Sequence, residues 1–262
     1  GFDVTIVDGE VLEDTVKVGT FLDINSTTHY KWTQLQKIAK MFHAGTVEKG
    51  ATFFFSDVEF WGLEAVRLLS DMNKVPVRIT GFLHAASYTH EDAFAVAAPY
   101  QQHTEVGWIA ALDNVFVGSE YHRKAVILRR LLDRPDLHSK IVVTKNPMFR
   151  EDYQFTGLLK KHRMLLTNRF DSEKRPGKTL SLFEKLKPEF PNWEFIVTTS
   201  RATFRSNDPN LVLYARRLEQ EGVITIKAGL TKAQYHAELE QAEIVVSHSP
   251  EENYGICIAE AI

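Results

Sequence analysis

Two glutamates near the end of the sequence, Glu252 and Glu260, stand on either side of Gly255. They belong to the stretch ENYGICIAE, which follows a short apolar run and the loop SHSP. A glycine that begins a helix lets a ligand approach the backbone, and the first amides of the helix, here those of Ile256 and Cys257, attract an anion. A carboxylate can accept hydrogen bonds from two neighbouring hydroxyls. The spacing therefore predicts a site for a phosphate-bearing sugar or nucleoside, although either glutamate taken alone is more typical of a solvated charge.

A second cluster places two cations on one loop, Arg169 and Lys174. The stretch LLTNRFDSEKR begins in an apolar segment, and a helical pattern follows it. The planar fork of an arginine and the compact charge of a lysine together suit a diphosphate. For this segment alone, a surface cluster paired with Asp171 and Glu173 remains the alternative.

These motifs need strands and helices to position them, and short β-branched runs alternate with longer helical patterns along the whole chain. We expect strands at residues 4–7, 51–55, 75–83, 114–117, 140–143, 163–166, 194–197, 223–227 and 243–246. We expect helices at residues 31–43, 60–72, 103–112, 121–132, 178–190, 210–221, 232–241 and 256–262. This alternation predicts parallel sheets with helices on both faces. Consecutive apolar residues at 53–55 and 244–246 predict strands buried on both sides.

The sequence predicts a domain boundary near residues 146–153, where Asn146-Pro147 ends a strand pattern and a polar stretch follows. We expect an α/β protein with two Rossmann-like parallel-sheet domains, 1–149 and 150–262, that face each other across a cleft. Ligands of such sheets bind beyond the carboxyl ends of the strands. The residues at those positions are Asp57, His84, Ser119, Asn146, Arg169, Ser200 and the loop 247–255.

The composition excludes several classes of protein. A chain of 262 residues with 44% hydrophobic and 25% charged residues is ordinary for a globular protein, and the net charge of −3 disfavours a chain that wraps nucleic acid. Cys257 is the only cysteine, which excludes an internal disulfide and a cysteine-rich metal site. No apolar run approaches the ~20 residues of a membrane span, and no signal peptide is evident. We expect a cytoplasmic fragment of a longer protein, because the sequence lacks an initial Met and ends inside a helical pattern.

The order of the two motifs resembles the carboxyl-terminal half of family-four glycosyltransferases of the GT-B fold. The GR-x-x-x-x-K-like loop of that family corresponds to Asn168-Arg169 through Lys174, with Asn in place of Gly. Its E-G-F-G-x-x-x-x-E-A motif corresponds to Glu252-Asn253-Tyr254-Gly255 through Glu260-Ala261, with Asn for Gly and Tyr for Phe. The stretches FPNWEFIV and IKAG also resemble family segments, and the match covers roughly 100 residues.

The amino-terminal half resembles the family less closely. The opening GFDVTI is similar to the second strand of the family, which implies that the first strand, its glycine-rich loop and the first helix are missing. Leu83-His84 resembles the strand end beside the donor sugar, and VFVGS resembles a later strand that ends in Ser. The stretch KIVVTKNP resembles the interdomain hinge, with Pro147 where Gly is usual.

The resemblance implies a retaining, metal-independent transfer of a sugar from a UDP-, GDP- or ADP-sugar, with no other cofactor. Arg169 and Lys174 would hold the donor diphosphate, assisted by the amides of Ile256 and Cys257. Glu252 would hold the sugar hydroxyls and Glu260 the ribose, while His84 would contact the reacting sugar. The remaining donor-binding positions are Lys227, Gly229, Tyr254 and Gly255. We expect Asp57 to be a structural or acceptor-binding residue rather than a nucleophile or base.

Several alternatives stay open at this stage. The acceptor is a small sugar, a lipid-linked sugar or a modified nucleobase in DNA or RNA, and the oligomeric state is not readable. A nucleotide-sugar epimerase or phosphorylase and a non-catalytic nucleotide-binding module are the competing functions. A dinucleotide dehydrogenase is disfavoured because no G-x-G-x-x-G follows a predicted strand. The amphipathic helix at residues 31–43 is more typical of a helix packed on a sheet than of a peripheral contact with the inner membrane face.

Overall fold

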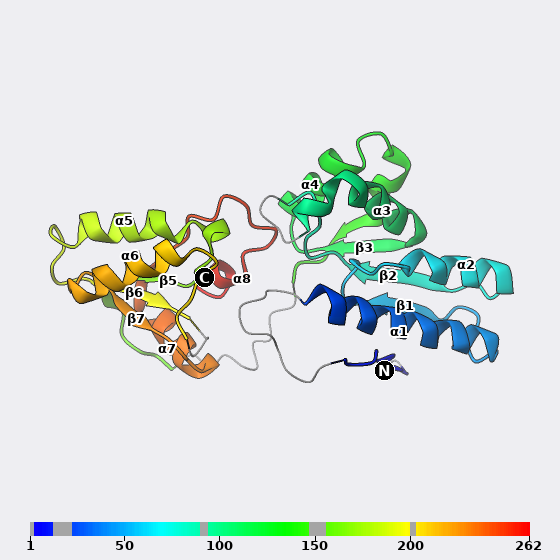
Figure 1. Ribbon diagram of the computed structural model, residues 1–262, viewed down its shortest axis with the longest axis horizontal. Coiled ribbons are helices and arrows are strands. Elements are labelled where there is room, and N and C mark those ends of the chain that lie inside the picture. The colour runs from blue at the N-terminus through cyan, green and yellow to red at the C-terminus, as the bar shows by residue number, and fades with distance from the viewer. Residues whose placement is uncertain (1–2, 13–22, 90–93, 147–155, 200–202) are drawn as a thin grey trace. The chain divides into compact units, whose positions relative to one another are not determined.

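The computed structural model describes residues 3–12, 23–89, 94–146, 156–199 and 203–262. The chain divides into two compact units, Gly1–Asn146 and Pro147–Ile262, and the described residues of each unit form its own four-stranded parallel sheet (Figure 1). Among the described residues, no helix combines the length and the apolar character that crossing a membrane requires.

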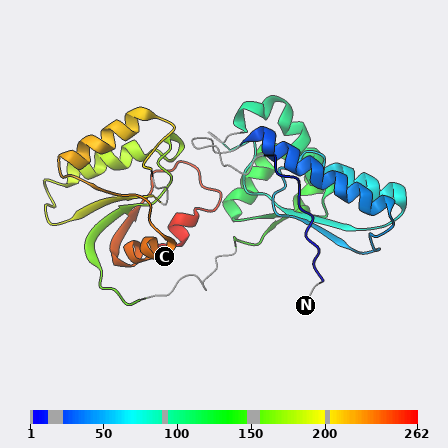
Figure 2. The same ribbon diagram turned by 60° about the horizontal axis from the view of Figure 1, so that its bottom comes forward.

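The first unit is built on the strand order β1-β2-β3-β4. Helix α1 packs beside α2 (Figure 2). Ile38 and Phe42 of α1 are buried in the core of the unit, while Trp32 is exposed. The α1 helix therefore packs its apolar side against the unit. The elements are α1(Ile24–His43), β1(Thr52–Phe55), α2(Leu63–Asn73), β2(Arg78–Phe82), η1(Ala95–Ala97), α3(Ala98–Ala111), β3(Asn114–Val117), α4(Glu120–Arg130), η2(Pro135–Lys140) and β4(Ile141–Val143).

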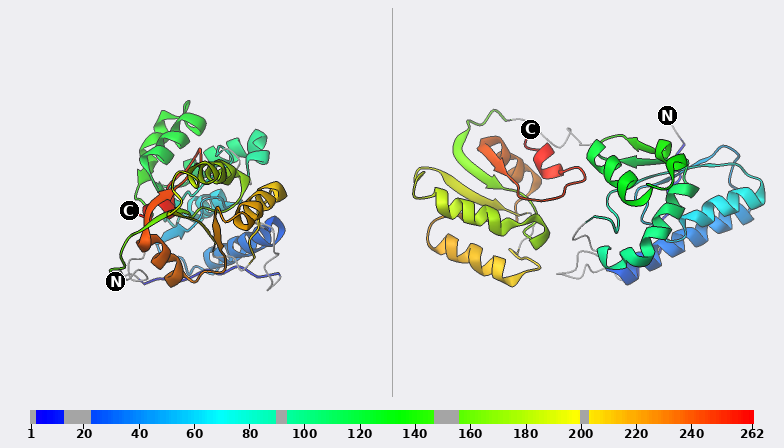
Figure 3. Two further views of the ribbon diagram at one scale, coloured as in Figure 1. Left: turned by 90° about the vertical axis from the view of Figure 1, so that its left-hand side faces the viewer. Right: turned by 90° about the horizontal axis from the view of Figure 1, so that it is seen from above.

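The second unit has the strand order β7-β6-β5-β8. Helices α5 and α6 lie side by side on one face of this sheet, and α7 lies on the other face, in contact with β5 and β8 (Figures 2 and 3). The reversal in strand order accounts for this, because right-handed crossovers in opposite directions place their helices on opposite faces. The elements are β5(Lys161–Leu166), η4(Ser172–Lys174), α5(Pro176–Leu186), β6(Glu194–Thr198), α6(Pro209–Gln220), β7(Thr225–Lys227), α7(Lys232–Gln241), β8(Ala242–Val246) and α8(Ile256–Ala259).

The alternation of strands and helices predicted from the sequence is confirmed from residue 24 onward, with shifts at the element ends. The largest shift is at α1, which begins seven residues before the predicted start at residue 31 because Asp23 caps it. The Asp23 carboxylate accepts hydrogen bonds from the backbone N–H groups of Asn25 and Ser26. Such a cap satisfies donors that have no partner inside the helix, and it allows a helix to start in a polar, β-branched stretch.

The strand predicted at residues 4–7 does not form. The carbonyl oxygen of Val7 accepts a hydrogen bond from Gln34 Nε2 at 2.8 Å, and that of Asp8 accepts one from Lys37 Nζ at 2.8 Å. Both donors belong to α1. A β-branched run becomes a strand only where a neighbouring strand supplies partners, and in this unit helix side chains occupy those carbonyl groups.

The prediction that residues 53–55 and 244–246 are buried on both sides is wrong for most of these positions: only Phe55 is buried, while residues 53, 245 and 246 are partly buried. Phe54 is 60% exposed and Ile244 is 40% exposed. Strands β1 and β8 each lie at the end of their sheet in the described part of the chain. A strand at the end of a sheet is covered less completely than a central strand, and the sequence pattern does not distinguish the two positions.

Candidate functional site

The topology of the second sheet brings together two loops that are far apart in the sequence. Strand β5 pairs with β6 on one side and with β8 on the other, so the chain reverses its direction across the sheet at β5. The loop after β5 carries Arg169 and Lys174, and the loop after β8 carries Glu252 and Gly255. Ligands of open α/β sheets bind at the carboxyl ends of the strands where the order reverses. Both predicted motifs lie at such a point.

Three side-chain contacts join these two segments. The Nζ atom of Lys174 lies 2.7 Å from Oε1 of Glu252. The Nδ2 atom of Asn168 donates to Oγ of Ser247 at 2.6 Å. Farther along, Oγ1 of Thr179 in α5 is hydrogen-bonded to Nδ1 of His248 at 2.9 Å. The Lys174–Glu252 contact directly joins the two motifs predicted from the sequence.

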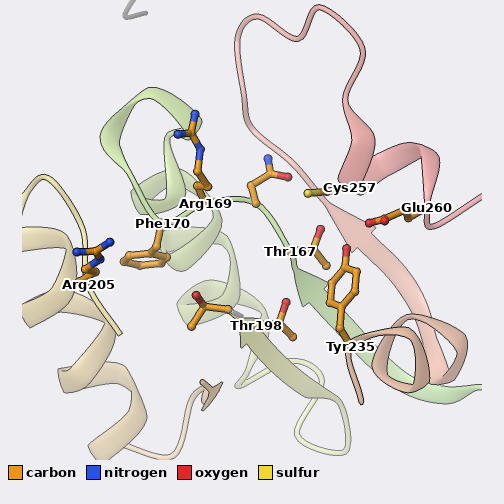
Figure 4. Close-up of a pocket in the computed structure, with 10 residues that line it drawn as sticks. Thr167, Arg169, Phe170, Thr198, Arg205, Tyr235, Cys257 and Glu260 are labelled. Carbon is orange, nitrogen blue, oxygen red and sulfur yellow. The ribbon is translucent and has the colours of Figure 1, made fainter. Parts of the chain in front are cut away.

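A pocket of about 250 Å³ opens beside these contacts, within the second unit (Figure 4). It is formed by the carboxyl ends of β5 and β6, the loops that follow them, α7 and α8. The residues that line it are Thr167, Asn168, Arg169, Phe170, Thr198, Thr199, Arg205, Tyr235, Cys257 and Glu260. Three residues predicted from the sequence to bind the donor, Arg169, Cys257 and Glu260, therefore share one pocket.

The cations of the site differ in their partners. Arg169 is 39% exposed at its side chain and forms an ion pair with Glu173. Lys174 has its contact with Glu252. The Nη1 atom of Arg205 is buried and has no hydrogen-bond partner among the described residues.

Sequence reasoning missed the pocket residues Phe170, Arg205, Tyr235 and Thr167 as candidates for binding. The Thr167 and Tyr235 hydroxyl oxygens are buried, and neither makes a hydrogen bond of normal geometry to another described residue. None of these four residues is at a defining position of a motif that the sequence shows. Only the expectation that ligands bind beyond the carboxyl ends of strands could have directed attention to Thr167, which directly follows β5. Ser200, which that expectation did select, lies outside the described residues.

Two titratable groups in the pocket are held in their neutral forms. Burial raises the pKa of the Tyr235 hydroxyl, and the neighbouring Cys257 and Glu260 raise it further. Burial also raises the pKa of the Cys257 thiol, and the carboxylates of Glu260 and Glu252 add to this effect. A first-turn position can lower a cysteine pKa, but burial and two acidic neighbours outweigh it here, which disfavours a thiolate nucleophile.

Gly255 precedes α8 with a φ of +71°, a conformation that side chains other than glycine rarely adopt. The first amides of a helix have no acceptor within it, which applies to those of Ile256 and Cys257. Tyr254 belongs to the loop before this turn, outside the residues that line the pocket.

Lys227 and Gly229 also lie outside the lining of the pocket. The Nζ atom of Lys227 is 2.5 Å from Oε1 of Glu238, so its side chain is directed to an ion pair. Its backbone carbonyl accepts a hydrogen bond from the N–H of Thr199, a pocket residue, at 3.0 Å. The backbone of this strand end therefore borders the pocket while the Lys227 charge does not enter it.

His84 and Asp57 belong to the first unit. His84 is exposed, its Nε2 atom lies 2.9 Å from the carbonyl oxygen of Ser56, and its ring stacks on Phe82 at 4.7 Å. Asp57 forms an ion pair with Lys31 at 2.8 Å and accepts a hydrogen bond from the N–H of Glu59 at 3.1 Å. Through these contacts Asp57 joins α1 to the segment that follows β1.

No protein-family model and no curated protein sequence matches the chain. Solved structures do match it. The pneumococcal O-GlcNAc transferase GtfA in complex with UDP and GlcNAc has a TM-score of 0.59 at 14% identity, over 89% of this chain and 43% of that one. A mutant of S. aureus TarM in complex with fondaparinux, alpha-GlcNAc-glycerol and UDP has a TM-score of 0.53 at 16% identity, over 71% of this chain and 35% of that one.

A third similar structure is the UDP-forming alpha,alpha-trehalose-phosphate synthase from Burkholderia xenovorans. Its TM-score is 0.58 at 13% identity, over 88% of this chain and 60% of that one. The chain thus spans between 35% and 60% of the length of these three proteins. At such identities the likeness establishes the fold. The prediction of an α/β protein with two Rossmann-like parallel-sheet units, as in GT-B enzymes, is confirmed.

Proposed function

We propose that the protein of which this chain is part is a glycosyltransferase that moves a sugar from a nucleotide-sugar donor to a hydroxyl group of an acceptor. The reaction retains the anomeric configuration and needs no divalent metal. The observation that carries the proposal is the 2.7 Å contact between Lys174 and Glu252, which joins the two donor motifs beside a pocket that also contains Arg169 and Glu260. The UDP present with GtfA and TarM, and the UDP-forming reaction of the trehalose-phosphate synthase, support a nucleotide-sugar donor.

In this proposal the second unit binds the donor. Arg169 and Lys174 hold the diphosphate, and the amides of Ile256 and Cys257 add two neutral donors. Glu260 accepts hydrogen bonds from the ribose hydroxyls, since a carboxylate matches two vicinal hydroxyls. Glu252 holds the hydroxyls of the sugar, and its contact with Lys174 keeps it beside the diphosphate. Tyr254, Gly255, Lys227 and Gly229 supply backbone around the donor.

The chemical step breaks the bond between the anomeric carbon and the diphosphate oxygen and forms a bond from that carbon to the acceptor oxygen. The acceptor attacks from the face that the diphosphate leaves, and its proton passes to the departing phosphate oxygen. Positive charge fixed beside the diphosphate stabilises its developing charge, and such preorganised electrostatic stabilisation usually contributes more to catalysis than any other single effect. The protein cations take the place of a metal.

We assign the first unit to the acceptor side, with His84 contacting the reacting sugar and Asp57 supporting the strand end. The acceptor is a small or lipid-linked sugar, with a modified nucleobase as the second possibility. The single cysteine fits a reducing compartment, and we place the protein in the cytoplasm, with the inner membrane face as the alternative.

The test is to incubate the chain with UDP-, GDP- and ADP-sugars and measure the release of nucleoside diphosphate. Replacing Arg169 by Ala should lower the rate about 100- to 1,000-fold, the usual effect of removing one charge-stabilising group. Replacing Glu252 by Ala should also lower the rate, because the hydroxyls of the donor sugar lose the acceptor that positions them. A nucleotide bound at 100 times its dissociation constant should stabilise the fold by roughly 2.7 kcal/mol, which a thermal shift detects.

Glu251→Ala is the matched control, because it removes the neighbouring carboxylate from the same loop and should leave the rate unchanged. Full activity in both Arg169→Ala and Glu252→Ala would end the proposal. Tight nucleotide binding without turnover would favour a binding module, and turnover of a UDP-sugar to its epimer without an acceptor would identify an epimerase.

A further inference from the structure

Arg205 follows β6, and the described residues on either side of it contact the loop that carries Arg169. The ring of Phe204 is buried and packs on Phe170, with ring centroids 4.6 Å apart. The N–H of Asn207 donates to Asp171 Oδ1 at 3.0 Å, and Asn207 Oδ1 accepts from the N–H of Ser172 at 2.8 Å. These reciprocal bonds fix the backbone on both sides of the pocket wall.

The electrostatic state of Arg205 differs from that of the two cations in the motif. Arg169 is paired with Glu173 and Lys174 with Glu252. In the part of the chain that the structure describes, Nη1 of Arg205 is buried without a hydrogen-bond acceptor. Burying a charged donor without a partner is costly, so a ligand that supplies an acceptor gains affinity there.

The charges of the pocket are separated in space. Figure 4 shows Arg169 and Arg205 toward one side of the pocket, with Thr167, Tyr235 and Glu260 toward the other. A molecule with an anionic end and a hydroxyl-bearing end matches this arrangement. A neutral nucleobase at Arg205 would leave this half-buried cation without a counter-charge, whereas a phosphate supplies both the charge and the acceptor oxygens.

We propose that Arg205 is a third cation for the donor diphosphate, acting with Arg169 and Lys174. The inference rests on the proposed donor site, and it adds a residue that the two sequence motifs do not contain. It also orients the ligand, with the diphosphate between Arg169 and Arg205 and the ribose toward Glu260. Among the described residues no carboxylate is paired with Arg205, so its interaction with the diphosphate is not offset by the loss of an ion pair.

The experiment measures dissociation constants by calorimetry for UDP, GDP and ADP with the whole chain, and then for the monophosphate and nucleoside of the tightest base. The variants are Arg205→Ala and Arg205→Lys, with Arg217→Ala as control. Arg217 has the same charge but is paired with Glu184 and Glu221 on the surface of α6. Thermal unfolding of each variant without nucleotide verifies that it folds.

We expect Arg205→Ala to weaken diphosphate binding about 10- to 100-fold, the range for a hydrogen bond to a charged group, and to leave nucleoside binding unchanged. Arg205→Lys keeps the charge but loses the planar fork of the guanidinium, so its affinity for the diphosphate should lie between that of the unaltered chain and that of Arg205→Ala. This variant remains informative if the alanine variant does not fold. Arg217→Ala should bind as the unaltered chain does.

The outcomes separate the two proposals. If the unaltered chain binds none of the three diphosphates, the proposed donor site itself is wrong. If it binds one of them and both Arg205 variants bind it equally well, the donor site stands and the role of Arg205 is refuted. A loss of equal size for nucleoside and diphosphate would also refute it, because the phosphates would not be involved.

Discussion

The buried cluster around Glu105 in the first unit and the pocket of the second unit differ in how their polar side chains are satisfied. In the first unit, beyond β2, Glu105 is 3% exposed; it forms an ion pair with Arg130 and accepts a hydrogen bond from the N–H of Ser87 at 2.8 Å. Beside it, the Tyr88 hydroxyl lies 2.7 Å from Nε2 of the buried His122. In the second unit, polar groups line a pocket, and some of their buried atoms have no partner among the described residues.

This difference separates two uses of buried polarity. A network whose members satisfy one another fixes a packing arrangement, and breaking it lowers stability. Polar groups held around a pocket without partners lower stability as they stand, which is typical of sites that bind a ligand. We therefore expect substitutions in the first group to act on folding and those in the second to act on nucleotide binding.

The largest effect should follow from Glu105→Ala. The change leaves the guanidinium of Arg130, whose side chain is only 10% exposed, without its counter-charge. Breaking a buried pair from one side typically costs about 3–5 kcal/mol. Denaturant unfolding followed by tryptophan fluorescence measures the loss, since Trp61 and Trp108 both lie in this unit.

The matched control is Asp136→Ala, whose partner Arg134 is exposed. Exposed pairs contribute little, so its unfolding midpoint should not move. Nucleotide binding should survive in folded Glu105→Ala protein. If stability held and binding disappeared, Glu105 would belong with the ligand-binding groups and the comparison would fail.

A smaller effect on stability should distinguish Tyr88 from Tyr235 when each is replaced by Phe. Tyr88→Phe removes the hydroxyl bonded to His122 inside the core, which should cost about 1–3 kcal/mol of stability. Tyr235→Phe removes a hydroxyl that lines the pocket, so stability should change by less than about 0.5 kcal/mol while nucleotide affinity falls several-fold. Unfolding curves and calorimetric titrations of both variants provide the comparison. Equal losses of stability would place Tyr235 in the same structural class as Tyr88.

The sequence predicted the order of elements well because each depends on local hydrophobic periodicity, whereas the start of α1 was misplaced because it depends on the cap Asp23. The prediction of a strand at residues 4–7 was wrong because the sequence pattern does not show whether a neighbouring strand is present, and Gln34 of α1 bonds the Val7 carbonyl instead. The exposure of Phe54 could not be predicted either, since it depends on which strand lies at the end of the sheet.

The candidate site also contains residues that the sequence could select and residues that it could not. Arg169, Lys174, Glu252 and Glu260 could be selected from the sequence because two motifs in a fixed order carry them, and their roles remain predictions. Arg205 and Tyr235 could not be selected, because their place in the pocket depends on the loop after β6 and the packing of α7 rather than on any spacing.

The smallest effect concerns the reactivity of Cys257, the only cysteine of the chain. Burial, with Glu260 and Glu252 nearby, raises the pKa of its thiol. A raised pKa means less thiolate at a given pH, and the thiolate is the form that reacts. Alkylation by iodoacetamide at pH 8 should therefore be slower in the folded chain than in the denatured chain, and the rate should rise at a higher pH in the folded chain.

Bound UDP should slow the alkylation of Cys257 further, because the thiol lines the pocket and a diphosphate adds negative charge beside it. Mass spectrometry of timed samples measures the rate, with the denatured chain as reference. Folded and denatured chains that react equally fast at pH 8 would show that neither burial nor the two carboxylates restrains the thiol, and the expected slowing by the pocket would be refuted.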